Sequence, residues 1–269
     1  MQILTSLGAD FRALWSLRRL VVVLTRREFA ARHAGSVGGI VWAWLPPLLT
    51  LFAYYLVFDV VFSMRLGENA PTSRVGAYLI VGMLPWMAFA DATQRGMNSL
   101  LEAGGMLQKN PLPPAIFPAR SVLASTFVFS PLILLLVFFY TPSHHFASGV
   151  FAVLPLYALQ ILLCFLLAYL LAVLAAALRD VVQVVGFMLS IGVFLSPVLF
   201  PVTMFPEAWR WVLWLNPMSA FVMGYQSALL QGAWPAVDVW AVVGIWVVVV
   251  GGVLNMAISR SRDQLVDWL

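Results

Sequence analysis

Long apolar runs separated by short charged segments constrain this chain more than any other feature. Of its 269 residues, 62% are hydrophobic and 10% are charged, whereas soluble domains carry about 25% charged residues. A soluble core cannot bury so much apolar surface. A bilayer accepts it, because about 20 apolar residues make one helical crossing. The pattern therefore predicts an all-α polytopic membrane protein.

Six apolar runs are long enough to be predicted as transmembrane helices. Their approximate limits are residues 39–62, 76–100, 121–140, 149–178, 181–202 and 237–258. Prolines interrupt the chain between the fifth and sixth runs, where we expect short re-entrant helices that turn at Asn216-Pro217, with an amphipathic surface loop as the alternative. The sequence thus predicts one domain: a cytoplasmic interfacial segment (1–36), a six-span region (37–258) and a cytoplasmic tail (259–269).

The basic residues are distributed unevenly over this topology. With the N-terminus inside, the external segments hold Arg65, Arg74 and Arg210, and the other twelve of the fifteen basic residues fall in the internal segments. Lys and Arg in short loops concentrate on the cytoplasmic side of membrane proteins. We therefore expect a multi-pass protein of the cytoplasmic (inner) membrane with both termini in the cytoplasm.

Sequence signatures of catalysis are missing. The single lysine, Lys109, is not preceded by the glycine loop that would cradle phosphates, and there is no G-x-S-x-G nucleophile elbow. The three histidines, His33, His144 and His145, lack metal-ligand spacing. We expect no catalytic residue, no metal and no cofactor on this chain, and no nucleic-acid partner. Because the spans are almost free of ionisable groups, the energy for any transport must come from a partner.

The first thirty residues predict an amphipathic interfacial helix. Arg12, Arg19 and Arg26 repeat every seven residues and so share one helical face, while Leu14, Leu17, Val21 and Leu24 fall on the opposite face. Such a helix lies in the interface plane with its arginines toward anionic headgroups. It is either a simple anchor or a collar beside a cytoplasmic entrance. The candidate entrance residues are Arg12, Arg19, Arg26, Arg27 and Arg32.

The inner end of the second span carries a polar stripe. Asp91, Arg95, Asn98 and Glu102 fall within a narrow arc of a helix. The order of Asp91 four residues before Arg95 favours an ion pair. We expect this pair to shield charge at the membrane boundary, and the alternative is a polar wall of a cytoplasmic vestibule.

Aromatic residues recur along the first and fifth spans. Four aromatic residues fall on one face of the first span when they are placed at helical spacing. In the fifth span, two aromatic residues share a face with a serine. Ordinary packing is the alternative to a functional role. However, a stripe along a whole helix differs from an interfacial belt, and ring faces suit a sliding sugar chain. The candidate channel-lining residues are Trp44, Tyr55, Phe58, Phe62, Phe187, Ser190 and Phe194.

Several short motifs follow one another in an order that resembles the ABC-2 type permeases of polysaccharide exporters. They are Arg27-Glu28, Arg32, Gly35-Ser36, Gly39, Trp42 and Pro47-Leu48 before and within the first span, Leu84-Pro85-Trp86 in the second, Lys109, Pro113, Ile116 and Pro118 after it, and Arg179-Asp180, Ser196-Pro197, Pro201, Pro206, Asn216-Pro217 and Tyr225 in the C-terminal half. At His33, Ala34, Gly38 and Pro46 the chain departs from the family pattern.

The resemblance implies a membrane subunit that works as a homodimer with two copies of a separate ATPase, which would bind ATP and Mg. The implied cargo is a lipid-linked polysaccharide of the O-antigen or capsular type, moved through a channel lined by the first and fifth spans. Periplasmic or outer-membrane export components are compatible partners, and membrane lipids are expected contacts. The alternatives are an ABC-2 exporter of small hydrophobic molecules and a non-transport scaffold for glycan assembly.

The same resemblance assigns roles to two further segments. The stretch from Leu101 to Arg120 would be a coupling helix that receives motion from the ATPase, and an ordinary loop is the alternative that its composition allows. Its candidate contact residues are Glu102, Leu107 and Lys109. The short helices before the sixth span would form an outer gate. The candidate gate residues are Trp211, Trp214, Asn216 and Pro217.

Overall fold

Helices joined by turns and short irregular segments make up the parts of the chain that the structure describes. The computed structural model describes residues 3–32, 35–67, 71–109, 112–140, 147–261 and 265–268. Over these residues the extended structure is a single antiparallel bridge between Arg65 and Arg74. His33, His144 and His145 lie outside the described residues.

Among the residues that the structure describes, five helical segments are long and apolar enough to cross a membrane. The first is α3 (Val41–Tyr54), continued by a π-helix, η1 (Tyr55–Val61). The others are α4 (Val75–Leu107), α5 (Ile116–Tyr140), α6 (Val153–Ala177) preceded by the 3-10 helix η3 (Ser148–Ala152), and α9 (Val237–Ser261). These confirm five of the expected runs. The protein is therefore an all-helical, multi-pass membrane protein.

The fifth expected run forms a shorter helix than its apolar length indicated. α7 (Asp180–Gly192) has 13 residues, about 20 Å, and turns replace the helix after it. Two local causes end the helix. The Ser196 hydroxyl donates to the carbonyl of Val193 at 3.1 Å, and Pro197 and Pro201 cannot donate a helical N–H. The expectation of one helix from 181 to 202 is thus wrong in its second half.

α4 lies at the centre of the bundle and packs against α5, α6 and α8 (Pro217–Leu230). Leu84, Met97 and Leu100 are fully buried. A Cβ at Gly96 would lie 2.5 Å from the Cβ of Ala168, so this glycine permits the close approach of α4 and α6. Small residues at crossing points are how membrane helices gain packing without a hydrophobic driving force.

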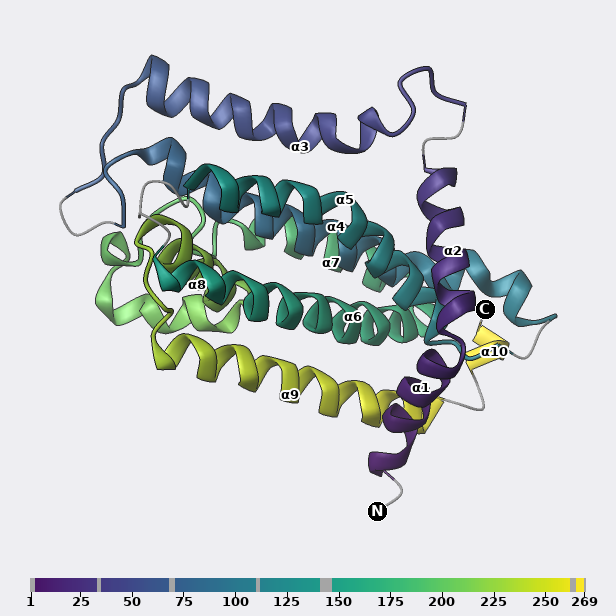
Figure 1. Cartoon of the computed structure of the whole chain (residues 1–269). Helices are drawn as coiled ribbons and strands as arrows, with labels where there is room; N and C mark the ends of the chain where they lie inside the picture. The colour runs from purple at the N-terminus through teal and green to yellow at the C-terminus, as the bar shows by residue number, and fades with distance from the viewer. Residues whose placement is uncertain are drawn as a thin grey trace.

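The two ends of the bundle differ in what covers them (Figure 1). Both chain termini lie at one end, hereafter the terminal end, where α1 (Ile3–Ser16) and α2 (Arg18–Ala31) run across the ends of the long helices. The short C-terminal α10 (Leu265–Trp268) also lies there. The expected N-terminal helix is thus present as two helices that meet at Leu17.

The opposite end, hereafter the distal end, holds the segment between α7 and α9. It contains two 3-10 helices, η4 (Val202–Met204) and η5 (Glu207–Leu215), followed by α8. The expected pair of short helices turning at Asn216-Pro217 is formed by η5 and α8. α8 is largely buried, with Phe221 and Tyr225 fully enclosed, so it belongs to the protein core.

Candidate functional site

A cleft of about 560 Å³ lies between α3 and the pair α4–α5. α3 stands apart from the other long helices in Figure 1, and its buried residues are Pro47 and Leu51. Pro46 also faces the cleft from α3, and Arg32 lies at its edge. The lining residues are Arg32, Trp42, Ala43, Pro46, Pro47, Met87, Ala90, Asp91, Gln94, Arg95, Val128 and Phe129. The cleft therefore combines apolar walls with a charged cluster.

One half of the charged cluster is centred on the carboxylate of Glu28. Arg32 pairs with it at 2.9 Å within α2, and Arg120 of α5 pairs with it at 3.2 Å. The Ser121 hydroxyl donates to the same carboxylate at 3.0 Å. Glu28 thus ties α2 to the start of α5, immediately after the α4–α5 connection.

The other half is centred on Asp91 of α4. Arg95 donates to Asp91 at 2.7 Å, which confirms the predicted pair. Ser125 of α5 donates to the second carboxylate oxygen at 2.5 Å, and Arg32 approaches that oxygen to 3.8 Å. Because Arg32 touches both carboxylates, it joins the two halves into one network across three helices.

Three guanidinium groups therefore share two carboxylates, which leaves a formal charge of +1 in the network. The Arg32 side chain is 10% exposed, and its Nε is buried without a hydrogen-bond partner among the described residues. Buried charges require partners because desolvation is costly. The cluster can hold three helices in register, and it offers an anionic group in the cleft an incompletely paired cation.

The candidate entrance arginines separate into two groups. Arg12, Arg19, Arg26 and Arg27 are exposed, whereas Arg32 is enclosed in the ionic network. On the opposite side of α2, Val21 and Thr25 are buried. The predicted division of the N-terminal helices into a basic and an apolar face is present, but Arg32 belongs to the cleft rather than to the basic face.

The aromatic candidates of the first span do not form one continuous face. The Trp44 indole N–H donates to the carbonyl of Val128 in α5 at 3.0 Å, whereas Tyr55 is exposed. The rings in contact are Tyr54 with Phe58 and Phe58 with Phe62, each with centroids 6.2 Å apart. The wider π-helical turns of η1 shift the face on which the residues after Tyr55 lie, Phe58 and Phe62 among them.

The channel-lining candidates of the fifth span all lie on exposed surface, Phe187 and Ser190 on α7 and Phe194 two residues after its end. Phe187 is 66% exposed and Phe194 is 61% exposed, with Ser190 between them. None of the thirteen described residues of α7 is buried. This face of α7 is therefore not covered by the described part of the chain.

The coupling candidates lie at the last turns of α4. Glu102 and Lys109 are exposed, whereas Leu107 is buried against the bundle. Glu102, Met106 and Lys109 follow helical spacing on the exposed side, and Met106 is a large apolar residue exposed there. The exposed side thus offers two charges around one apolar side chain.

The outer-gate candidates include a residue that fastens two helices. The Asn216 side-chain N–H₂ donates to the carbonyl of Gly192 at the end of α7 at 2.8 Å. Its oxygen accepts from the N–H of Met218 at 3.0 Å and so caps α8. Pro217 occupies the first helical turn of α8, Trp211 is exposed, and the Trp214 carbonyl accepts from the Trp246 indole at 3.2 Å.

Several polar contacts at the distal end are absent from the sequence-based set of candidates. The Tyr78 hydroxyl donates to the carbonyl of Pro197 at 2.7 Å, and Gln226 donates to the same carbonyl at 2.8 Å. Asp59 accepts from the N–H of Gly76 at 2.9 Å at the start of α4. A carboxylate at a helix N-terminus is favourable. The acidic residue Asp59 at the end of an apolar run is the sequence feature that could have indicated this contact.

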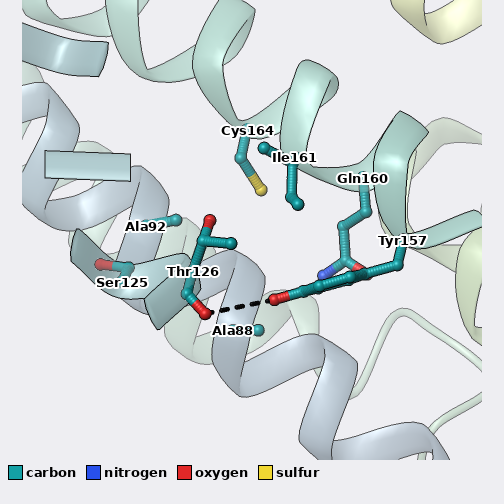
Figure 2. A pocket seen from close by; sticks show the side chains of 8 residues that line it. All are labelled: Ala88, Ala92, Ser125, Thr126, Tyr157, Gln160, Ile161 and Cys164. Carbon is teal, nitrogen blue, oxygen red and sulfur yellow. Dashed lines mark hydrogen bonds between the residues drawn. The ribbon is translucent and has the colours of Figure 1, made fainter. Parts of the chain in front are cut away.

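A small cavity with polar and apolar lining residues lies in the core between α4, α5 and α6 (Figure 2). Its volume is about 10 Å³, close to the minimum for one water molecule. The Tyr157 hydroxyl is 2.9 Å from that of Ser130. Gln160 accepts from Tyr225 and donates to the carbonyl of Pro85, each at 2.8 Å. A lone glutamine in the apolar run of α6 is the signal that could have indicated this network.

The described residues contain no group of three or more His, Cys, Asp or Glu side chains that could hold a metal ion. The arrangement is instead a half-open cleft with apolar walls and a charged cluster at one end. Such a site can bind and guide an amphiphilic molecule.

Comparison with known proteins identifies the family. The profile of the ABC-2 type transporter family matches residues 19–230. The O-antigen export system permease protein RfbA of Myxococcus xanthus is 30% identical over 94% of this chain and 96% of its own length. RfbA of Klebsiella pneumoniae is 25% identical over 86% and 89%, and the polysialic acid transport protein KpsM of Escherichia coli is 24% identical over 79% and 81%. The chain belongs to the ABC-2 type transporter family, as a transmembrane subunit.

Proposed function

We propose that this chain is the permease subunit of an ATP-driven exporter that moves a lipid-linked polysaccharide, of the O-antigen or capsular type, across the cytoplasmic membrane. The observation that carries the proposal is similarity along nearly the whole chain to a permease of O-antigen export. The relatives named for O-antigen and for polysialic acid transport both support a long glycan as the cargo.

The proposed topology has six spans with both termini in the cytoplasm. Both termini lie at the terminal end (Figure 1), which requires an even number of crossings. α7 with the turns after it would make the fifth. Single-cysteine variants test this, because the native Cys164 is buried. A membrane-impermeant maleimide added to intact cells should label Ser73→Cys and leave Gln108→Cys unlabelled, and the reverse result would contradict the topology.

The proposed route begins at the cleft beside α3. The apolar walls suit the lipid part of a substrate, and the network around Arg32 offers a cation to its phosphate. One protomer is too small to enclose a wide conduit. The exposed aromatic faces of η1 and α7, with Phe62 and Phe187, would line a channel between two copies, and η5 with Trp211 and Trp214 would close it on the outside.

The proposed energy source is a separate ATPase docked at the last turns of α4. Met106 would enter a groove of that partner, with Glu102 and Lys109 pairing at its rim. Lys109→Glu should abolish glycan-stimulated ATP hydrolysis in the reconstituted complex and leave the melting temperature unchanged. Gln108→Glu, also on exposed surface, is the matched control for added negative charge. Normal stimulation in Lys109→Glu would exclude this docking mode.

Deletion of the gene tests the function as a whole. We expect loss of the surface glycan and accumulation of lipid-linked polymer inside the cell. Loss of resistance to small hydrophobic compounds, with a normal surface glycan, would instead support export of small molecules. Failure of polymer synthesis, with no co-purifying ATPase, would support a scaffold for glycan assembly.

A further inference from the structure

A second hollow, separate from the cleft, lies on the other side of α5. It has a volume of about 270 Å³ and runs between α5 and α6 under the N-terminal helix. Its nine lining residues are all apolar: Phe11, Leu14, Ala119, Val122, Leu123, Ala158, Ile161, Leu162 and Phe165. It shares no residue with the cleft beside α3.

The groove exists because small side chains face it on both helices and a third helix covers its end. Ala119 of α5 and Ala158 of α6 leave space where larger residues would interdigitate. From α1, the Phe11 ring packs edge-on against Phe165, with ring centroids 5.7 Å apart and planes at 65°. Together with Leu14, Phe11 closes the groove toward the terminal end, while Ala158 is exposed.

The chemistry at the covered end is that of a membrane interface. Trp15 is 73% exposed. The Arg18 guanidinium lies 5.3 Å from the centroid of its ring and donates to its backbone carbonyl at 3.1 Å. Trp15 follows Phe11 by four residues on α1 and so lies on the same side of that helix. Arg18, the first residue of α2, is held beside the covered end by these contacts with Trp15. Tryptophan and arginine are the residues enriched at headgroup level.

We infer that the groove binds one acyl chain of a bilayer phospholipid whose phosphate lies at Arg18, with Trp15 beside the glycerol. The groove has no polar side chain with which water or a sugar could form a hydrogen bond. Leaving a cavity of this size empty would cost free energy, because the side chains of its walls would lack van der Waals contacts. Acyl chains are the apolar molecules that a bilayer supplies at this depth. The charged end selects an anionic headgroup. The lipid would then fix α1 against α5 and α6.

Native mass spectrometry of the purified full chain, with added phosphatidylglycerol or phosphatidylcholine of matched chains, tests this inference. We expect one retained phospholipid per chain and an about five-fold preference for phosphatidylglycerol, as one arginine near an anionic lipid provides. Ala158→Leu fills the groove and should abolish retention. Arg18→Gln should remove the preference for phosphatidylglycerol, while one phospholipid is still retained through its acyl chain.

Matched controls keep the result interpretable. Ala177→Leu adds the same side chain at an exposed site at the end of α6, and Arg179→Gln removes an exposed arginine at the terminal end. Both should behave as the wild type. If Ala158→Leu fails to fold, Ala158→Val provides the milder filling. Equal phospholipid retention in a folded filled variant would overturn the inference, as would recovery of a polyprenyl phosphate in place of phospholipid. Neither outcome depends on glycan export.

Discussion

Removing the charge of Glu28 tests whether the ionic network holds the terminal end together. Glu28→Gln keeps the size of the side chain but removes the carboxylate with which Arg120 pairs at 3.2 Å, and it leaves Arg32 with Asp91 at 3.8 Å. Arg32 is 10% exposed and Arg120 is 16% exposed, so water does not solvate either guanidinium fully. Breaking one partner of a buried pair costs about 3–5 kcal/mol. Because Glu28 itself is 18% exposed, we expect the lower part of that range.

The expected loss is measurable as a change in melting temperature. For a chain of this size, 1 kcal/mol corresponds to about 2–4 °C. Glu28→Gln should therefore lower the apparent melting temperature of the detergent-purified protein by about 6–14 °C. Tryptophan fluorescence at one fixed scan rate gives the comparison between variants. The same variant should loosen α2 from α5, visible as faster hydrogen exchange in α2.

The matched control is Arg95→Gln, which removes a charge from the exposed edge of the same network. Arg95 is 47% exposed, and exposed ion pairs contribute about 0–1 kcal/mol. Its melting temperature should fall by less than about 4 °C. The double variant Glu28→Gln/Arg120→Gln should be more stable than the sum of its single variants by about 1–3 kcal/mol. Strict additivity, or an equal effect of Arg95→Gln, would refute the network as a stabilising unit.

Substitutions at three further positions test contacts at the distal end and in the core. Gly76→Ala places a Cβ 2.8 Å from the Asp59 carboxyl carbon. It should displace Asp59 from the N-terminus of α4 and lower the free energy of unfolding by about 1–2 kcal/mol. An unchanged melting temperature would contradict the contact. Asn216→Ala should cost about 1–2 kcal/mol and increase proteolysis between α7 and α8, whereas Asn216→Asp should retain the α8 cap. Tyr225→Phe leaves a buried Gln160 oxygen without its donor and should cost about 1–3 kcal/mol, and a neutral result would mean that water replaces the hydroxyl.

The course of the chain through the membrane could be predicted largely from the sequence. Uninterrupted apolar runs make helices because backbone groups in hydrocarbon must bond within the segment. Five runs became long helices, and the turn at Asn216-Pro217 followed from its prolines. The fifth run, from Val181 to Val202, did not form a single helix, because apolar length says nothing about where Ser196 and Pro197 end the helical hydrogen bonds.

The sequence by itself determined the class, the number of apolar runs and the pair Asp91–Arg95, because each depends on residues close together in the chain. Tertiary structure alone decided which distant groups meet. Spacing could not show that Glu28 pairs with Arg120, since the two lie on separate helices that packing brings together. Nor could helical periodicity show that Trp44 bonds to Val128 of α5, because that contact depends on how α3 packs against the bundle. The π-helix that begins at Tyr55 changes only the face on which later residues, Phe58 and Phe62 among them, lie. Burial of Arg32 and Leu107 likewise depends on how α2, α4 and α5 pack, which local sequence does not encode.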